Sequence, residues 1–227
     1  MPPKVIIIAA GPTRTGKYRF PPNAKPKNLF HYNGETLLDR QLRMFRECGI
    51  ESFRLVVGYR ANDLIAYNKT RGLGLEIVCN PHWEGGIFHT IWLSLEGLDE
   101  DVILVWGDTV FLSKAILEAF LSASNPLVCL NHGKTELGRG SPDAFKIDRE
   151  KLPLVRKIEE YDDIHDERYD AIRATFALQR LVGENGGLIM YVQGVTDIDF
   201  YGQTDEGGGR KRRKKRRLRL AREGKRK

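Results

Sequence analysis

Residues 5–14 read VIIIAAGPTR, and this order predicts a buried strand that runs directly into a ligand-binding turn. The apolar run, rich in β-branched residues, is typical of a strand covered on both faces. It ends in two alanines and Gly11, whose side chains are too small to keep a ligand away from the backbone. Such a turn presents bare N–H groups that can bind phosphate. An ordinary buried strand and turn would give the same pattern, so the turn alone does not define a function.

Two cations follow this turn. Arg14 stands at its end, and Lys27 follows Pro26 one loop further on. Positive side chains beside a phosphate-binding turn suit a reaction that builds negative charge on phosphorus. Together with Gly11, they favour phosphate chemistry over a turn without a ligand.

The rest of the chain alternates between predicted strands and helices, as in βαβ units with a mostly parallel sheet. Thr36 and Asp39 form a capping pattern at the start of one helix, and Gly49 is a natural stop after it. After the opening strand, the predicted strands are 53–57, 75–79, 102–106, 127–130, an antiparallel pair at 144–147 and 155–158, and a returning strand at 188–192. The predicted helices are 37–48, 61–70, 87–97, 113–123 and 169–182. The predicted fold is therefore α/β: three α/β/α layers around a mostly parallel, Rossmann-like mixed sheet.

The end of the chain differs in composition from the rest. Three glycines, 207–209, form a flexible joint, and in residues 210–227 Lys and Arg outnumber the single Glu by 12. Because the whole chain carries +7, residues 1–209 carry −5. We expect a folded domain at 1–206 and a disordered basic tail at 207–227. The tail either binds polyanions or is only a solvated terminus, and it has no aromatic residue to stack on bases.

Several motifs resemble one known family. The order Ala-Ala-Gly, then Arg14, then Pro26-Lys27 is similar to that of nucleotidyltransferases that join a nucleoside triphosphate to a sugar 1-phosphate or to phosphocholine. Further matching segments are GETLLDR at 34–40, LVVGY at 55–59, VILVWGD at 102–108 and DID at 197–199. The resemblance is good from residue 4 to about 130, thin to about 195 and absent in the tail. The family's G-x-G-[ST]-R turn is here one residue shorter and lacks the second glycine.

The resemblance implies the nucleotide-diphospho-sugar transferase type of fold and a Mg²⁺-dependent site at the carboxyl ends of the strands, where open α/β sheets bind ligands. Asp108 is the main expected metal ligand, with Asp199 as the second and Asp197 as a substitute for it. The expected catalytic residues are Arg14, Lys27 and Asp108. The expected nucleotide-binding residues are Ala9, Ala10, Gly11, Pro12, Thr13, Gly58, Tyr59, Asn80 and Gly107. The acidic residues would alternatively be a turn-capping aspartate and surface carboxylates.

The expected reaction needs no general base. A phosphomonoester is already ionised near neutral pH, so its oxygen can attack the α-phosphorus of the triphosphate directly. Catalysis then consists of aligning and neutralising two anions. The resemblance places Arg14 against the β- and γ-phosphates and the leaving pyrophosphate, and Lys27 against the α-phosphate or the attacking one.

Residues 80–93 indicate which class of acceptor the enzyme would use. Their Asn-Pro pair, aromatic residue, small hydroxyl residue and Trp-Leu pair resemble the phosphocholine branch more than the sugar branch. Trp83 is then a candidate for cation–π contact with a quaternary ammonium, and Thr90 is a second candidate for substrate binding. The aromatic residues would alternatively lie in the core or at its rim, and for Trp92 we favour that interpretation.

Composition and missing motifs argue against several other classes of protein. No apolar run approaches the about 20 residues of a membrane helix, and the opening apolar run is too short for a signal peptide. Cys48, Cys79 and Cys129 share no close spacing, so we expect reduced, buried thiols and a cytoplasmic location. A glycosyltransferase of this fold would need Asp-x-Asp where residues 108–110 offer one acid. The first turn also lacks the Gly-x-Gly-x-x-Gly of dinucleotide-binding oxidoreductases.

The leading interpretation is an enzyme whose product is a CDP-alcohol, and two alternatives to it remain. Within the enzyme class, the product would be a nucleotide-sugar. In a different class, the chain would keep the fold without turnover and bind polyanions or nucleic acid through residues 210–227. The expected partners of the enzyme are a nucleoside triphosphate and a phosphorylated small molecule.

The tail should be separable from the chemistry, because residues 210–227 contain only three apolar side chains to bury. Truncation after Gly209 should leave thermal stability and pyrophosphate release nearly unchanged while abolishing retention on an anionic column at moderate salt. A large loss of stability would mean that the tail packs on the domain. Lost activity with intact stability would mean that its charge helps to hold the substrate.

Overall fold

The computed structural model describes residues 2–12, 24–132, 141–163, 173–192 and 195–197. The predictions for Thr13, Arg14 and Asp199 lie outside these residues. So do the tail at 207–227 and the first part, 169–172, of the last predicted helix.

Strand β1, Lys4–Ala9, lies inside a seven-stranded sheet. It pairs in parallel with β6, Val102–Trp106, on one side and with β4, Phe53–Val57, on the other. The strand order is β10-β8-β9-β6-β1-β4-β5, with β5 at Glu76–Cys79, β8 at Leu127–His132, β9 at Ser141–Ile147 and β10 at Leu188–Val192. Of these seven strands, β9 alone runs antiparallel to its neighbours. The sheet is mixed and mostly parallel, as predicted.

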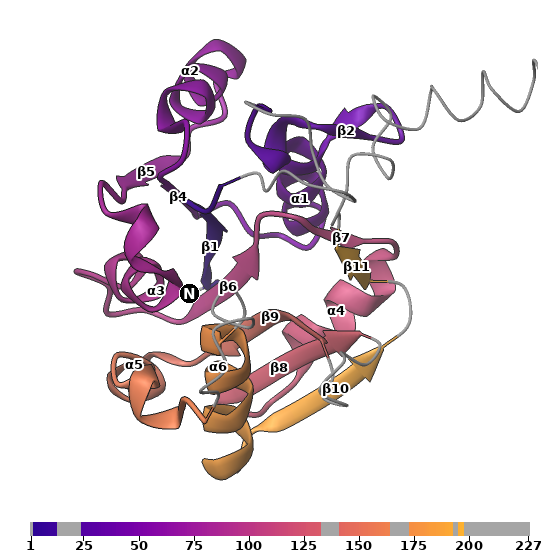
Figure 1. Ribbon diagram of the computed structural model, residues 1–227. Helices are drawn as coiled ribbons and strands as arrows, with labels where there is room; N and C mark the ends of the chain where they lie inside the picture. Colours follow the sequence, from indigo (N-terminus) through magenta and orange to yellow (C-terminus); the bar gives the residue numbers. More distant parts are fainter. Residues whose placement is uncertain (1, 13–23, 133–140, 164–172, 193–194, 198–227) are drawn as a thin grey trace, which may run out of the picture.

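Helices cover both faces of this sheet (Figure 1). One layer contains α1 at Leu37–Arg46, α2 at Ala61–Arg71 and α4 at Lys114–Ser122. The other contains α3 at Ile87–Ser94, α5 at Leu152–Val155 and α6 at Arg173–Glu184. Alternate side chains of β1 enter the two cores: Val5, Ile7 and Ala9 under the first layer, and Ile6 and Ile8 under the second. The predicted three-layer α/β/α arrangement is confirmed.

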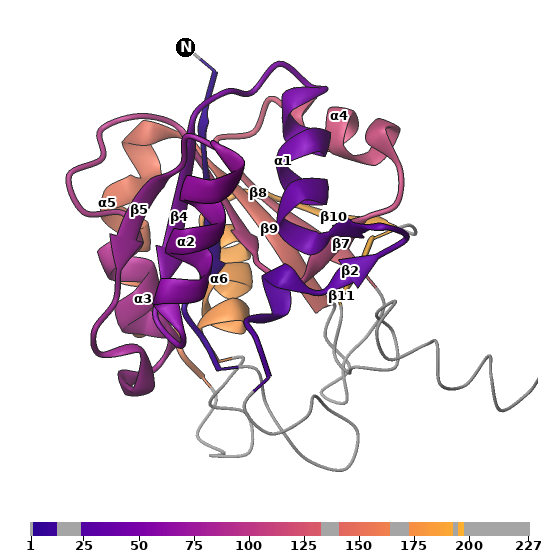
Figure 2. The same cartoon turned by 90° about the horizontal axis from the view of Figure 1, so that it is seen from above.

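Two short ribbons lie beside the main sheet. Strand β7, Thr109–Phe111, pairs with β11, Val195–Asp197, and β2, His31–Tyr32, pairs with β3, Glu35–Thr36. Figure 2 shows β2, β7 and β11 gathered at one end of the molecule. Because β7 follows β6 after a two-residue turn, this end is the one where β6 finishes.

Helix α1 begins and ends as its sequence predicts. The hydroxyl of Thr36 accepts a hydrogen bond of 3.0 Å from the backbone N–H of Asp39. Gly49 follows the helix with a φ of +83°, which favours glycine. The cap confirms the predicted start of the helix, although the helix ends at Arg46, two residues earlier than predicted.

The strand predicted at 155–158 is wrong, whereas the one at 144–147 is confirmed as part of β9. Leu152, Val155 and Ile158 are all buried in the second core at a spacing of three residues, which fits helical turns and not alternation. Pro153 lies in the first turn of α5, where its missing N–H costs no helical bond. The segment therefore forms α5 and then a short 3₁₀ helix, η4, at Ile158–Tyr161.

Burial corrects the prediction that all three cysteines are buried. All three are free, but only Cys129 is buried, whereas Cys48 is half-buried and Cys79 is exposed. Trp92 is 49% exposed and lies at the rim, in agreement with the interpretation favoured for it. No helix among the described residues has the length and apolar character that crossing a membrane requires.

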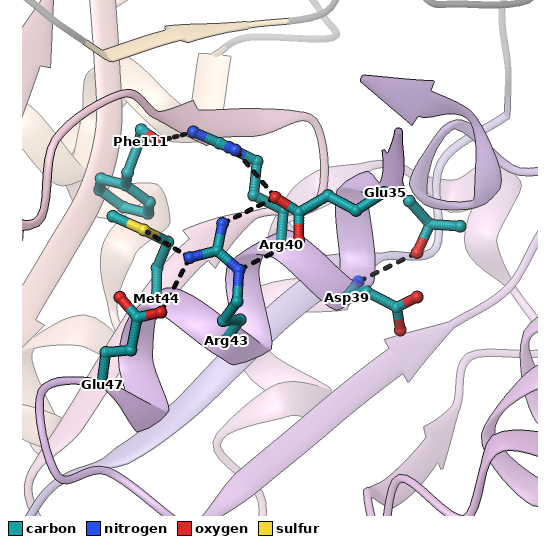
Figure 3. A network of polar contacts seen from close by, with 8 residues as sticks. Glu35, Asp39, Arg40, Arg43, Met44, Glu47 and Phe111 are labelled. Carbon is teal, nitrogen blue, oxygen red and sulfur yellow. Dashed lines mark hydrogen bonds and ion pairs between the residues drawn. The ribbon is translucent and has the colours of Figure 1, made fainter. Parts of the chain in front are cut away.

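A charged cluster joins the β2–β3 ribbon to α1. Figure 3 shows the carboxylate of Glu35 between Arg40 and Arg43, at 2.9 and 2.7 Å from their guanidinium nitrogens. Arg40 also donates to the carbonyl of Phe111 in β7, at 3.0 Å. Hydrogen bonds from Arg43 lower the pKa of Glu35, burial opposes them in part, and Arg40 lowers the pKa further. Glu35 thus holds two arginines of α1 in place, one of which reaches β7.

Glu35→Gln should lower the free energy of unfolding at pH 7 by about 1 kcal/mol, because charge-assisted hydrogen bonds to two arginines are weakened. A lowered pKa means that the charged carboxylate is favoured in the folded state. Its contribution is complete above the unfolded-state pKa and disappears as the pH falls through the lowered folded-state value. Urea unfolding curves of variant and parent should therefore differ at pH 7 and converge in acid.

Glu47→Gln is the matched control, since this more exposed carboxylate also pairs with Arg43, at 2.9 Å. It should cost no more than about 0.5 kcal/mol. An equal loss for Glu35→Gln at both pH values would contradict an electrostatic origin.

Candidate active site

The ends of β1, β4 and β6 are held against one another by backbone hydrogen bonds. Tyr59 N–H donates to the carbonyl of Ala10, and Gly107 N–H donates to that of Ile8, both at 2.9 Å. Asn80 N–H donates to Val57 at 2.7 Å just after β5. The structure thus brings the segments around Ala10, Gly58, Asn80 and Gly107 together at one edge of the sheet.

Two of these glycines are required by close approach. A Cβ on Gly58 would lie 2.5 Å from Cβ of Trp83 and 2.7 Å from the carbonyl oxygen of Ala10. A Cβ on Gly107 would lie 2.2 Å from Nδ2 of Asn28 and 2.9 Å from the carbonyl oxygen of Ile8. Gly11 differs, because a Cβ there would meet no atom of the described residues within 4 Å. As far as the described part of the chain shows, the exposed turn at Gly11 and Pro12 therefore has open space beside its backbone.

Lys27 and Asp108 form an ion pair at this edge, although 81 residues separate them in the sequence. Lys27 begins a 3₁₀ turn, η1, at Lys27–Leu29, and Asp108 lies in the turn between β6 and β7. Both side chains are about three-quarters or more buried, at 19% and 24% exposure. The next residue, Asn28, donates from Nδ2 to the carbonyl of Gly107 at 2.9 Å. Two of the three predicted catalytic residues are therefore in direct contact.

The β7–β11 ribbon brings a second acidic residue toward Asp108. In its register Asp197 lies opposite Thr109, the residue that follows Asp108. Among the described residues there is no group of three His, Cys, Asp or Glu side chains that could hold a metal by itself. A cation at this edge would thus depend on a few carboxylates together with the oxygen atoms of a bound substrate.

Of the predicted residues in the segment after β5, Asn80 and Thr90 bind to each other and Trp83 contacts Tyr59. Asn80 is buried, donating from Nδ2 to the Thr90 hydroxyl at 3.0 Å and accepting from His82 N–H at 2.9 Å. Trp83 meets Tyr59 edge to face, with ring centroids 5.6 Å apart. Asn80 and Thr90 shape the loop that presents Trp83, and roles for them in ligand binding remain predictions.

Sequence reasoning missed polar residues around the Asp108 turn, namely Asn28, Gln41 and Asp143. Gln41 is a buried amide on the inward face of α1, where the sequence already showed a polar residue beside Leu38 and Leu42. Asp143 is fully buried in β9, contacts His132 at 2.7 Å, and accepts at its carbonyl from the Thr109 hydroxyl at 3.3 Å. A β-strand pattern gave no signal for that carboxylate.

Comparisons with known proteins agree on the type of domain. The profile of the MobA-like NTP transferase domain matches residues 5–167. The bifunctional IPC transferase and DIPP synthase of Thermococcus kodakarensis is 26% identical over 166 residues, which cover 72% of this chain and 36% of that protein. The chain thus spans about a third of the length of this relative.

Solved structures show the same fold. The inositol-1-phosphate CTP transferase of T. maritima superimposes with a TM-score of 0.63 at 17% identity, covering 88% of this chain and 90% of the other. The CTP:phosphocholine cytidylyltransferase of Streptococcus pneumoniae gives a TM-score of 0.60 at 18% identity, covering 89% and 96%.

Alanine substitution should reduce stability at Gly58 and nucleotide binding at Gly11. Gly58→Ala should destabilise the protein by about 1–3 kcal/mol, because its new methyl group overlaps Trp83 and the Ala10 carbonyl. Gly11→Ala should leave stability within about 0.5 kcal/mol but weaken nucleotide binding, because the methyl group fills the open side of the turn. Thermal unfolding with and without nucleotide measures both effects. Equal nucleotide binding by Gly11→Ala and parent would exclude close contact at this turn.

Proposed function

Because the chain belongs to the MobA-like NTP transferase family, we propose that it transfers a nucleotidyl group from a nucleoside triphosphate to a phosphorylated small molecule and releases pyrophosphate. The observation that carries the proposal is the Lys27–Asp108 ion pair at the carboxyl ends of β1 and β6. Ligands of open α/β sheets bind at this edge. A cation and a carboxylate in contact there supply the two kinds of charge that phosphoryl chemistry uses.

We propose CTP as the donor and a small alcohol phosphate as the acceptor. Two of the similar solved structures carry CTP in their names, one with inositol 1-phosphate and one with phosphocholine. The half-buried Trp83, set by its contact with Tyr59, supports a cationic acceptor such as phosphocholine. A sugar 1-phosphate is the second acceptor class to test.

The carboxylates at the site fit a magnesium ion. Mg²⁺ binds through one or two carboxylates and substrate phosphates. Asp108 offers a partly exposed carboxylate, and Asp197 lies opposite the following residue, Thr109, in the ribbon register. Asp108 with Asp197 or Asp199 would hold the ion. When bound, the ion would neutralise negative charge on the triphosphate and the leaving pyrophosphate.

The remaining steps fall to the protein's own side chains. An acceptor phosphate oxygen forms a bond to the α-phosphorus as the bond to the bridging oxygen breaks, and pyrophosphate leaves with that electron pair. Lys27 would contact the α-phosphate or the attacking phosphate, since its ammonium group already lies beside Asp108. Arg14 would contact the β- and γ-phosphates from the end of the Gly11 turn. No general base is required, because the attacking oxygen is already ionised.

We propose two further properties in addition to the enzymatic activity. The basic tail at 210–227 would bind polyanions, and the protein would work in the cytoplasm. A polyanion-binding protein without turnover is the alternative from another class. This alternative predicts that the protein is retained on an anionic column through its tail and releases no pyrophosphate from any nucleotide.

Asp108→Asn should fold normally yet lose ~10²–10³ in turnover, because it removes charge from the metal site without removing volume. Lys27→Met should lose a similar factor. Each protein would be incubated with CTP, UTP, ATP or GTP, Mg²⁺ and a panel containing phosphocholine, inositol 1-phosphate and glucose 1-phosphate, and pyrophosphate would be measured.

The matched control is the Lys114–Glu118 ion pair on α4, at 3.0 Å. Lys114→Met and Glu118→Gln should leave turnover unchanged. Full activity of Asp108→Asn, or of the parent in excess chelator, would refute the metal-dependent mechanism.

A further inference from the structure

The turn that carries Asp108 is held by side-chain amides from two other elements. Gln41, on α1, donates from Nε2 to the carbonyls of Trp106 and Thr109, both at 2.8 Å. Asn28, in η1, donates from Nδ2 to the carbonyl of Gly107 at 2.9 Å. The carbonyls of the residues immediately before and after Asp108 are therefore both bound by amide groups from outside the turn.

Both amides are almost completely buried, at 1% exposure for Gln41 and 4% for Asn28. Burying an amide is unfavourable unless its polar atoms are satisfied. Gln41 lies beside Leu38, Leu42 and Phe45 in the inward face of α1, and its Oε1 has no hydrogen-bond partner among the described residues. An apolar side chain would fill this position without leaving such an acceptor. The benefit of Gln41 must therefore lie in the two carbonyls that it holds.

Asn28 connects the two halves of the ion pair. It directly follows Lys27, and the residue that it binds, Gly107, directly precedes Asp108. The missing side chain of Gly107 makes room for it, since a Cβ there would lie 2.2 Å from Nδ2. The loop of Lys27 and the turn of Asp108 are thus joined both by charge and by this uncharged hydrogen bond.

Arg40 extends the same restraint to β7. It lies next to Gln41 on α1, and Figure 3 shows it reaching from Glu35 to the carbonyl of Phe111, 3.0 Å away. Strand β7 pairs with β11, which carries Asp197. Two adjacent residues in the middle of α1 therefore bind the Asp108 turn and the strand that follows it.

We propose that Gln41 and Asn28 are positioning residues for nucleotidyl transfer. They hold the backbone of the Asp108 turn and of the Lys27 loop in place, so that both charged side chains project into the site where substrate binds. The proposal rests on the proposed function, because it concerns the residues to which that function assigns the chemistry. Preorganised charges act most strongly when their supports are fixed.

The test replaces each amide by a side chain of similar size without donors. Gln41→Met and Asn28→Leu should lower kcat by ~10- to 100-fold, since small displacements of catalytic groups have effects of this size. Both should also raise the Mg²⁺ concentration for half-maximal activity severalfold. The controls are Gln179→Met, a buried glutamine on α6, and Asn68→Leu, whose amide binds the backbone of Leu75 away from the site. The controls should leave kcat and Mg²⁺ dependence unchanged.

A second measurement does not depend on activity. The N–H of Gly107 is bonded to the carbonyl of Ile8, so hydrogen exchange reports the tightness of the turn. Exchange in a peptide covering residues 106–111 should accelerate in Gln41→Met and Asn28→Leu and not in the controls. If Gln41→Met fails to fold, Asn28→Leu, outside the regular helices, carries the same test.

The outcomes separate the two proposals. A parent protein that releases no pyrophosphate with any nucleotide overturns the proposed function and with it the positioning role. An active parent whose variants keep kcat and Mg²⁺ dependence overturns the positioning role alone, whether or not exchange accelerates. Slower turnover together with faster exchange, absent in the controls, supports it.

Discussion

The burial of β1 on both faces is the constraint on which the rest of the molecule depends. Its side chains alternate between two cores, and parallel neighbours pair with it on both edges. A strand in that position can expose backbone only beyond its end, at Gly11, which follows the buried Ala10. The same core that stabilises the domain therefore determines where a ligand can reach the main chain.

The edge where the strands end is built by close approach and by amide groups. Gly58 and Gly107 allow neighbouring segments to come within distances that no side chain would permit, and Asn28 uses the space at Gly107. Lys27 and Asp108 meet because the loops that carry them are tied together on uncharged atoms as well. The Lys27–Asp108 ion pair and the hydrogen bonds that support its two loops therefore lie at the same place.

The sequence predicted the layers and the sheet, because apolar periodicity carries that information, and it placed Asp108 at a strand end. A common site for Lys27 and Asp108 was implied by the resemblance to a known family. Sequence reasoning failed at 155–158, where an apolar residue at every third position was mistaken for alternation, and at Cys79, whose exposure depends on tertiary packing. Asn28 and Gln41 escaped prediction for a different reason. Both amides bind backbone carbonyls far along the chain. Every residue has such a carbonyl, so the sequence does not indicate which ones are bound.

The position of β9 between β6 and β8 has a consequence for biosynthesis. As the chain leaves the ribosome, β1, β4, β5 and β6 can assemble in order, but the far edge of β6 has no partner until residue 147 has been made. Strand β8 emerges earlier and cannot take its final place, because its link to the sheet is also β9. The nascent domain thus carries an open strand edge through about forty residues of synthesis, the kind of surface to which chaperones bind.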